Sequence, residues 1–293
     1  MITLKNDDII KKLIENCIPH TKTETSQSIK IITQNETFLI TGNHITNRGF
    51  SLIKKVKDYV LKNVDYKNVK THKNTHYFYF KNFLECEFKD YVEIDVNAAY
   101  FNIALQKKYI DKDVFNYAFE YDNMKLARLV SLGSLATKKV IFDFDIKTKD
   151  YVFNNITVSE TEKVFFDISH ELGNIMYDLI NLLPSDVLSF FWVDAIFAPK
   201  EYKDVIINYL KNKNLEVKTY ILDNVTITKE NDFLFKVKTI KNKNNEIKNY
   251  FFTDNKKKLL FLQNNKKMSF EETKIIKAKS NDSFKTLLKN LKI

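Results

Sequence analysis

The sequence predicts a mixed α+β fold in which an antiparallel sheet is backed by helices. In some segments apolar side chains recur every three or four residues, which is typical of helices, and in others they alternate or run together, which is typical of strands. The chain has 293 residues, of which 44% are hydrophobic, with only four Gly and three Pro. This composition excludes a disordered chain, a collagen-like or mucin-like chain and a small disulfide scaffold.

The first 90 residues predict a small α/β region. Residues 7–17 and 50–64 have helical spacing, and Pro19 ends the first of these helices. Residues 29–40 predict two strands, and aromatic residues alternate as in a strand between residues 77 and 88.

The remaining segments alternate helices and strands around two apolar strands that contain aspartate. Residues 91–95 predict the first of these strands, and residues 188–198 predict an apolar hairpin whose only charge is Asp194. The other expected elements are helices over 98–108, 124–138, 165–183 and 203–211, a hairpin over 139–158, strands over 217–227 and 233–240, and a last amphipathic helix near 284–291.

Positive charge is concentrated in the last quarter of the chain. Residues 229–293 contain 17 lysines and seven acidic residues, so this segment alone accounts for the net charge of +10. Clustered lysines attract phosphate without a shaped pocket, which favours a nucleic acid as partner. The alternative is a Lys-rich surface that reflects an AT-rich genome.

Cysteine usage and hydropathy indicate a cytosolic protein. Cys17 and Cys86 are the only cysteines, which excludes a disulfide framework and fits a reducing compartment. No segment approaches the roughly 20 apolar residues of a membrane span, and the first eight residues are too polar for a signal peptide. His72 and His76 lie in a polar stretch that predicts a solvated loop, and no glycine-rich phosphate loop is present.

Asp95 and Asp194 are each a charge in an otherwise apolar strand. A carboxylate in such surroundings is costly unless it is paired or binds a cation. For Asp194 the alternative is a solvated position at the tip of a hairpin turn, where aspartate is common.

The order of motifs around these aspartates resembles the palm core of family B DNA polymerases. The segment Asp95-Val-Asn-Ala-Ala-Tyr100 resembles the first palm motif, Asp-x-x-Ser-Leu-Tyr-Pro. Lys125 and Gly133 have the spacing of the finger motif Lys-x-x-x-Asn-Ser-x-Tyr-Gly, and Trp192-Val-Asp194-Ala-Ile lies over the hairpin motif Asp-Thr-Asp-Ser-Ile. The layout of residues 91–240 looks most like the protein-primed phage branch.

The resemblance implies a polymerase-type palm over residues 91–240 with reduced fingers, a small region over 1–90 and a basic, thumb-like region over 241–293. It implies template-directed DNA synthesis in a phage-like element, with primer–template DNA, deoxynucleoside triphosphates and a priming or accessory protein as partners. Two Mg²⁺ or Mn²⁺ ions would be held by carboxylates, the hard ligands that these ions prefer. The implied residues are Asp95 and Asp194 for the metal ions, Tyr100, Lys125, Arg128 and Gly133 for the nucleotide, and Lys236 and Lys238 for the DNA backbone. Glu93, two residues before Asp95 on the same strand face, is expected to add a carboxylate to the metal site. The charged cluster Lys256, Lys257 and Lys258 is expected to contact the DNA backbone as well.

The sequence also departs from the family pattern. Trp192 replaces the first aspartate of the hairpin motif, and Leu129 and Leu132 replace the asparagine and tyrosine of the finger motif. Fewer than 95 residues precede Asp95, so we expect no proofreading exonuclease. Three alternatives therefore stay open: an inactive polymerase-like DNA-binding or assembly protein, a reverse-transcriptase-like polymerase, and an α+β interaction protein with a basic tail.

Overall fold

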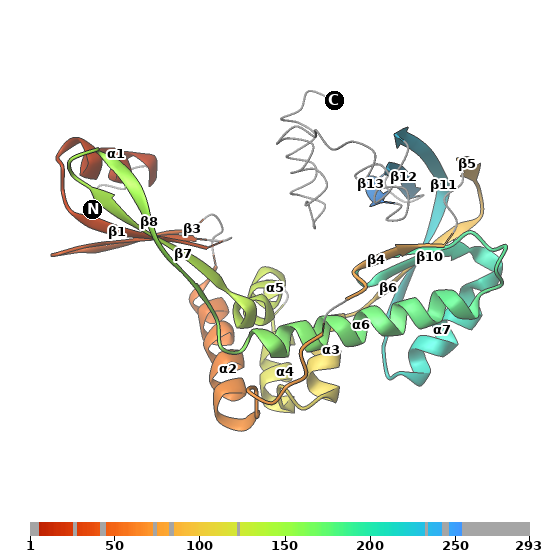
Figure 1. The fold of residues 1–293 in the computed structure, drawn as a ribbon. Helices are drawn as coiled ribbons and strands as arrows, with labels where there is room; N and C mark the ends of the chain where they lie inside the picture. The colour runs from red at the N-terminus through yellow and green to blue at the C-terminus, as the bar shows by residue number, and fades with distance from the viewer. Residues whose placement is uncertain are drawn as a thin grey trace. The chain divides into compact units, whose positions relative to one another are not determined.

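The structure is a computed structural model that describes residues 6–25, 28–41, 45–72, 75–81, 85–121, 124–231, 234–241 and 246–253. It is a mixed α+β fold with antiparallel sheets backed by helices (Figure 1), as the sequence predicts. The chain divides into two compact units. The first unit comprises residues 1–74 and 100–171, and the second comprises residues 75–99 and 172–293.

The first unit contains an antiparallel sheet with the strand order β3-β2-β1-β7-β8. Its strands are β1 (His20–Glu24), β2 (Ser28–Thr33), β3 (Thr37–Thr41), β7 (Lys138–Asp145) and β8 (Asp150–Val158). Helix α1 (Asn6–Glu15) precedes them, and Leu13 of this helix and Ile31 of β2 are buried. β1 joins strands that are distant in sequence, since it pairs with β2 on one side and with β7 on the other.

Short helices complete the first unit. They are α2 (Asn47–Asn63), α3 (Ala99–Gln106), which begins one residue before the boundary, α4 (Lys112–Phe119), α5 (Lys125–Gly133) and the 3-10 turn η2 (Ser134–Ala136). The Thr46 hydroxyl caps α2 by accepting from the Gly49 N–H at 3.2 Å, and the Asp111 carboxylate caps α4 by accepting from Val114. Leu52, which shares the apolar face of α2 with Val56 and Val60, has no exposed surface, so this face forms the core of the unit.

The second unit contains an eight-stranded antiparallel sheet. The order is β13-β12-β11-β6-β10-β9-β4, and β5 pairs with β11 off this path. The strands are β4 (Phe78–Phe80), β5 (Cys86–Phe88), β6 (Tyr91–Val96), β9 (Phe190–Trp192), β10 (Ala195–Pro199), β11 (Val217–Asn231), β12 (Leu234–Lys241) and β13 (Glu246–Thr253). β4 and β13 stand at opposite ends of this order, yet the rings of Phe80 and Phe252 lie 5.2 Å apart. The sheet therefore curls on itself.

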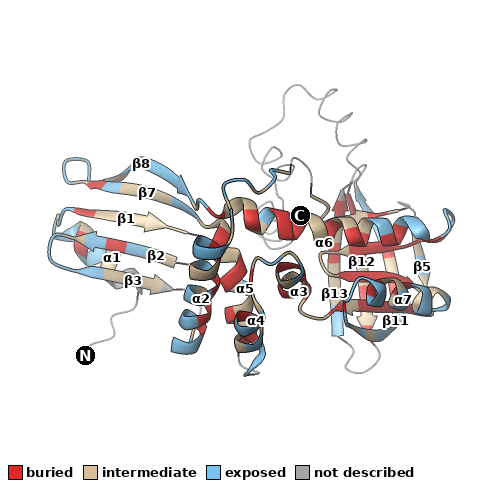
Figure 2. Cartoon of the chain, turned by 90° about the horizontal axis from the view of Figure 1, so that it is seen from below, coloured by how far each residue is buried: buried red, intermediate tan, exposed pale blue. Residues whose placement is uncertain are grey.

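Helices back one face of the curled sheet. Helix α6 (Glu162–Leu182) begins in the first unit, and its residues from Leu172 on belong to the second; the turn η3 (Lys200–Tyr202) leads into α7 (Lys203–Asn212). Figure 2 shows the end of α6 and α7 over the same side of this sheet. Lys81 Nζ donates to the carbonyls of Ile180, Leu183 and Pro184 at the end of α6, which satisfies acceptors that a helix end leaves open.

The other face of the curled sheet holds an aromatic cluster. Its members are Phe78, Phe80, Phe190, Trp192, Phe197, Tyr250 and Phe252. Phe190 and Phe197 stack with ring centroids 4.4 Å apart, and both have no exposed surface. The core of the second unit thus extends to both sides of the sheet.

Several expectations need correction. β1, α4 and β13 are not among the elements expected from the sequence, and α5 ends at Gly133, earlier than residue 138. β13 pairs with β12 along its whole length, so residues 246–253 belong to the sheet of the second unit. The helix expected near 284–291 and the lysines at 256–258 lie outside the described residues.

Candidate functional site

Asp95 lies near the end of β6, between β10 and β11. Its register partners are Ala195 of β10 and Lys218 of β11. Because successive strand residues face opposite sides, the buried Ile94 faces away from the side that Asp95 shares with Glu93. Burial of the apolar side chains on one face of β6 thus fixes both carboxylates on the other face.

Asp194 occupies a two-residue turn between β9 and β10. The turn joins the register pair Trp192 and Ala195 and consists of Val193 and Asp194. Val193 has a φ of 57°, which is strained for a β-branched residue. Its N–H donates to the Tyr77 carbonyl at 2.6 Å, and the Asp194 carbonyl accepts from the Val96 N–H at 2.9 Å. The turn is therefore anchored on both sides, and Asp194 lies beside the strand that carries Asp95.

Glu93 is a buried carboxylate on the same face as Asp95. It is 3% exposed, and its Oε1 lies 2.9 Å from Lys241 Nζ and 3.7 Å from Lys248 Nζ. Lys241 Nζ also lies 3.9 Å from the centre of the Tyr220 ring. The second oxygen, Oε2, is buried and makes no hydrogen bond with the described residues. Glu93 is thus ion-paired through one oxygen, whereas the other has no neutralising partner among those residues.

Burial and neighbouring charges shift the pKa of Asp95 in opposite directions. Burial raises the pKa of Asp95, and the neighbouring Glu93 carboxylate raises it further. Lys241, Lys248 and Lys218 lower it, and the net result is a pKa above the usual aspartate value. A cation bound at this carboxylate would favour the charged form.

Trp192, at the position of the first aspartate of the hairpin motif, belongs to the aromatic cluster. Its ring stacks on Phe78 at 5.1 Å and meets Phe252 edge-on at 5.4 Å. At this position the structure therefore has an aromatic ring in the core of the second unit.

The four residues expected to bind the nucleotide belong to the first unit. Tyr100 stacks on Phe165 with centroids 6.1 Å apart, and Lys125 is exposed at the start of α5. The Arg128 guanidinium donates to the Ala118 carbonyl at 2.9 Å and lies over the Phe119 ring, so it ties α5 to α4. Gly133 is the last residue of α5.

Lys236 and Lys238 lie on β12, on the face opposite the aromatic cluster. They alternate with Phe235 and Val237, which are buried. Their neighbours across β11 are Thr228 and Thr226. Both lysines are half-buried, and together they give this strand a positively charged face.

A buried charge cluster in the first unit was missed by the sequence analysis. Asp167 of α6 is 6% exposed; its Oδ1 lies 2.6 Å from His72 Nε2, and its Oδ2 accepts from the Tyr109 hydroxyl at 2.6 Å and from Lys107 Nζ at 2.9 Å. The His72 ring also stacks on His170 at 3.7 Å. His72 is therefore held against α6, contrary to the solvated loop that the sequence predicts. The chain has only five histidines, two of which, His72 and His170, meet in this cluster. Nothing in the sequence indicates that these residues and Tyr109 lie close together.

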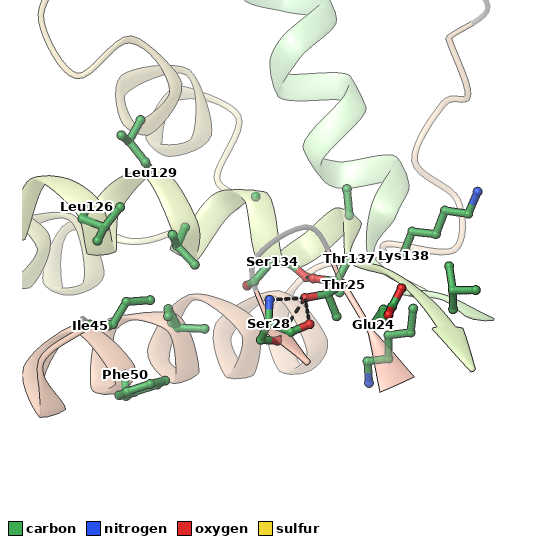
Figure 3. A pocket seen from close by; sticks show the side chains of 16 residues that line it. Glu24, Thr25, Ser28, Ile45, Phe50, Leu126, Leu129, Ser134, Thr137 and Lys138 are labelled. Carbon is green, nitrogen blue, oxygen red and sulfur yellow. Dashed lines mark hydrogen bonds between the residues drawn. The ribbon is translucent and has the colours of Figure 1, made fainter. Parts of the chain in front are cut away.

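The first unit also contains a groove of about 830 Å³. Apolar side chains of α2 and α5, including Phe50 and Leu129, line it (Figure 3). Gly133 also lines it, beside polar and charged residues that include Glu24, Ser134 and Lys138, so one nucleotide-site candidate lies in a groove with both apolar and polar walls.

Comparisons with known proteins leave the chain without an assigned family. No protein-family model and no curated protein matches it. Among the described residues, no helix is both long and apolar enough to cross a membrane. In the same part of the chain, no three or more His, Cys, Asp or Glu side chains form a group suited to a metal ion.

Proposed function

We propose that the chain carries out template-directed DNA synthesis by nucleotidyl transfer, with Asp95 and Asp194 as the catalytic carboxylates. One observation carries the proposal: Asp95 lies in β6 and Asp194 directly precedes β10, and these two strands pair with Ala195 opposite Asp95. A palm requires its two metal-binding aspartates on neighbouring strands of one antiparallel sheet, as the resemblance implies.

The carboxylates on and beside β6 are the chemical type that divalent cations prefer, although the described side chains do not form a group of three that is suited to a metal ion. Asp95, Asp194 and Glu93 Oε2 would hold Mg²⁺ or Mn²⁺, since carboxylate oxygens suit these hard ions. Burial, together with the Glu93 carboxylate, raises the pKa of Asp95, and a bound cation would offset this by favouring the charged form. Oε2 of Glu93 is a buried acceptor without a hydrogen bond to the described residues. When bound, such ions would lower the pKa of the primer hydroxyl and neutralise negative charge on the leaving pyrophosphate.

The protein's own groups would position that chemistry. Lys241 fixes Glu93 through Oε1, which leaves Oε2 without a hydrogen bond to the described residues. The anchored turn at Val193 holds Asp194 next to β6. The nucleotide-binding roles of Tyr100, Lys125, Arg128 and Gly133, like the DNA contacts of the lysines, remain predictions of the resemblance.

A polymerase-like DNA-binding protein without catalysis is the second candidate. Two observations favour it: Glu93 is ion-paired with Lys241, and Trp192 contributes an aromatic ring to the core where the motif has a carboxylate. This candidate retains the fold and the basic surface but lacks metal-dependent synthesis.

Primer extension tests the proposal. The native protein is compared with Asp95→Asn, Asp194→Asn and the control Asp223→Asn, an exposed aspartate of β11, on DNA and RNA templates with Mg²⁺ or Mn²⁺ and all four deoxynucleotides. We expect DNA-templated extension that falls by about 100-fold or more in the two site variants, because each removes a metal ligand, and is retained in the control.

Binding to primed DNA, measured by fluorescence anisotropy, separates the candidates. Binding without extension under either metal contradicts the proposed synthesis and supports the second candidate. Extension on RNA alone identifies a reverse-transcriptase-like enzyme instead.

A further inference from the structure

Strand β8 is an exposed edge of the five-stranded sheet. Its residues are exposed except for the half-buried Tyr151, and its apolar side chains include Phe153 at 56% and Ile156 at 43% exposure. Figure 2 shows the strand pale blue over most of its length. In the part of the chain that the structure describes, β7 is the strand that pairs with it. The edge of β8 that faces away from β7 presents backbone groups that another strand can bind.

This edge lacks the lysine and proline that protect many natural edge strands. Natural edge strands carry lysine or proline, which prevent another strand from adding to the sheet. Residues 151–158 contain neither, and no charged residue, although lysine is abundant in the chain. Ile141 of β7 pairs with Asn155 and Phe142 pairs with Phe153, so Asn154 of β8 is an extra residue without a register partner. This bulge is the one interruption of the pairing between β7 and β8.

The bulge places four apolar residues of β8 on one face. Phe153 pairs with Phe142 and Ile156 pairs with Val140, and residues 142 and 140 share a face of β7. By the same alternation, Tyr151 and Val158 lie on this face too. An even alternation without the bulge would have put Phe153 and Ile156 on opposite faces.

We propose that β8 pairs antiparallel with β8 of a second copy of this chain, joining two sheets around a two-fold axis. In the register centred between Asn154 and Asn155, Phe153 faces Ile156 of the second copy and Tyr151 faces its Val158. Every apolar side chain on that face thus meets another apolar side chain, and each pair occurs twice by symmetry.

Charge at the strand ends supports a second copy as the occupant. Lys149 directly precedes β8, and Glu160 follows it. In the same register, Lys149 of one copy stands opposite Glu160 of the second copy. Both side chains are exposed, and the two-fold axis forms this opposite-charge pair twice. An unrelated extended peptide would use the same backbone edge but gives no reason for this self-complementary pattern.

Sedimentation velocity on the full chain tests the pairing. We expect the native protein to sediment as a dimer of twice its 34.7 kDa mass and to dissociate on dilution. Ile156→Lys should raise the dissociation constant by about tenfold or more, because it puts a charge in the paired face. The control is Ile32→Lys on the interior strand β2, where the isoleucine has a similar exposure of 40%. A native protein that stays monomeric, or equal dissociation constants for both variants, overturns the proposal.

A charge exchange tests the register. Lys149→Glu and Glu160→Lys should each weaken the dimer by creating like-charge pairs, and the double variant Lys149→Glu/Glu160→Lys should restore it. Glu160 also accepts a hydrogen bond from Tyr66 in its own chain at 3.0 Å, but the loss of that bond cannot produce restoration in the double variant. Failure of the double variant to restore the dimer, with its far-UV circular dichroism unchanged, rules out this register.

Discussion

Gly173 and Gly133 both lie in helices but differ in the space around them. A Cβ on Gly173 would clash with the His76 carbonyl oxygen and would lie 3.1 Å from the backbone nitrogen of that residue. A Cβ on Gly133 would meet no heavy atom within 4 Å. Glycine at 173 is therefore required by close packing of the segment at His76 against α6, whereas glycine at 133 is not required by packing.

Alanine at these positions should change stability in different directions. We expect Gly173→Ala to lower the free energy of unfolding by about 1–3 kcal/mol, because backbone must move to admit the methyl group. Gly133→Ala should leave it unchanged or raise it by up to about 1 kcal/mol, since alanine restricts the unfolded chain and favours the helix. Urea denaturation of both variants measures the difference, and equal losses would contradict the assigned role of Gly173.

At the scale of elements, Asp167 joins three segments of the first unit. It connects α6 to His72 in the segment after α2 and to Lys107 and Tyr109 after α3. Burial by itself raises the pKa of Asp167, but hydrogen bonds from Tyr109, Lys107 and His72 outweigh burial and lower it below the usual value. The folded state therefore favours the charged form of this carboxyl group.

This pKa shift predicts a pH-dependent stability. Because the folded-state pKa is lowered, the contribution is present above the unfolded value of about 3.9 and is lost as the pH falls through the folded value. Asp167→Asn should lower the free energy of unfolding by about 1–3 kcal/mol at pH 7, and the gap to the native protein should close below about pH 4. Urea denaturation from pH 7 to pH 3 measures this, with Asp223→Asn as the control. A gap that does not change with pH would show that Asp167 acts by packing alone.

Elements with a strong local pattern were predictable from the sequence. The spacing of Leu52, Val56 and Val60 predicts α2, and all three are buried. Strand β1 has no such signal because its sequence, His20-Thr-Lys-Thr-Glu24, is polar, and it forms by pairing with β2 and β7. β13 was missed because lysine and asparagine around it indicated a basic tail, although Tyr250 and Phe252 alternate into the aromatic cluster.

The candidate site was predictable only in part, because some of its contacts join residues that are distant in the sequence. The apolar strands around Asp95 and Asp194 are local features, and the resemblance supplied the expectation that they are neighbours. The bond between Glu93 and Lys241 depends on the order of β6, β11 and β12 in the sheet. The partners of Asp167 lie up to 95 residues away from it in the sequence, and no periodicity links them to it.

At the scale of the whole molecule, net charge bears on nucleic-acid binding. The chain carries +10, but a total charge does not identify the surface that binds. Lys236 and Lys238 are the described members of the lysines expected to contact DNA, and they share one face of β12. Each lysine that contacts a phosphate releases condensed counterions, so its contribution appears in the salt dependence of binding.

Replacing these two lysines should therefore change the salt dependence as well as the affinity. For Lys236→Ala/Lys238→Ala, the slope of log K against log salt should become shallower by roughly 0.9 for each lost phosphate contact. Fluorescence anisotropy with labelled primed DNA over a range of salt concentrations measures the slope. The control is Lys54→Ala/Lys57→Ala, two exposed lysines of α2 that remove the same net charge. If both double variants change the slope equally, DNA binding follows the total charge; if only the β12 variant does, this face of the curled sheet contacts the phosphate backbone.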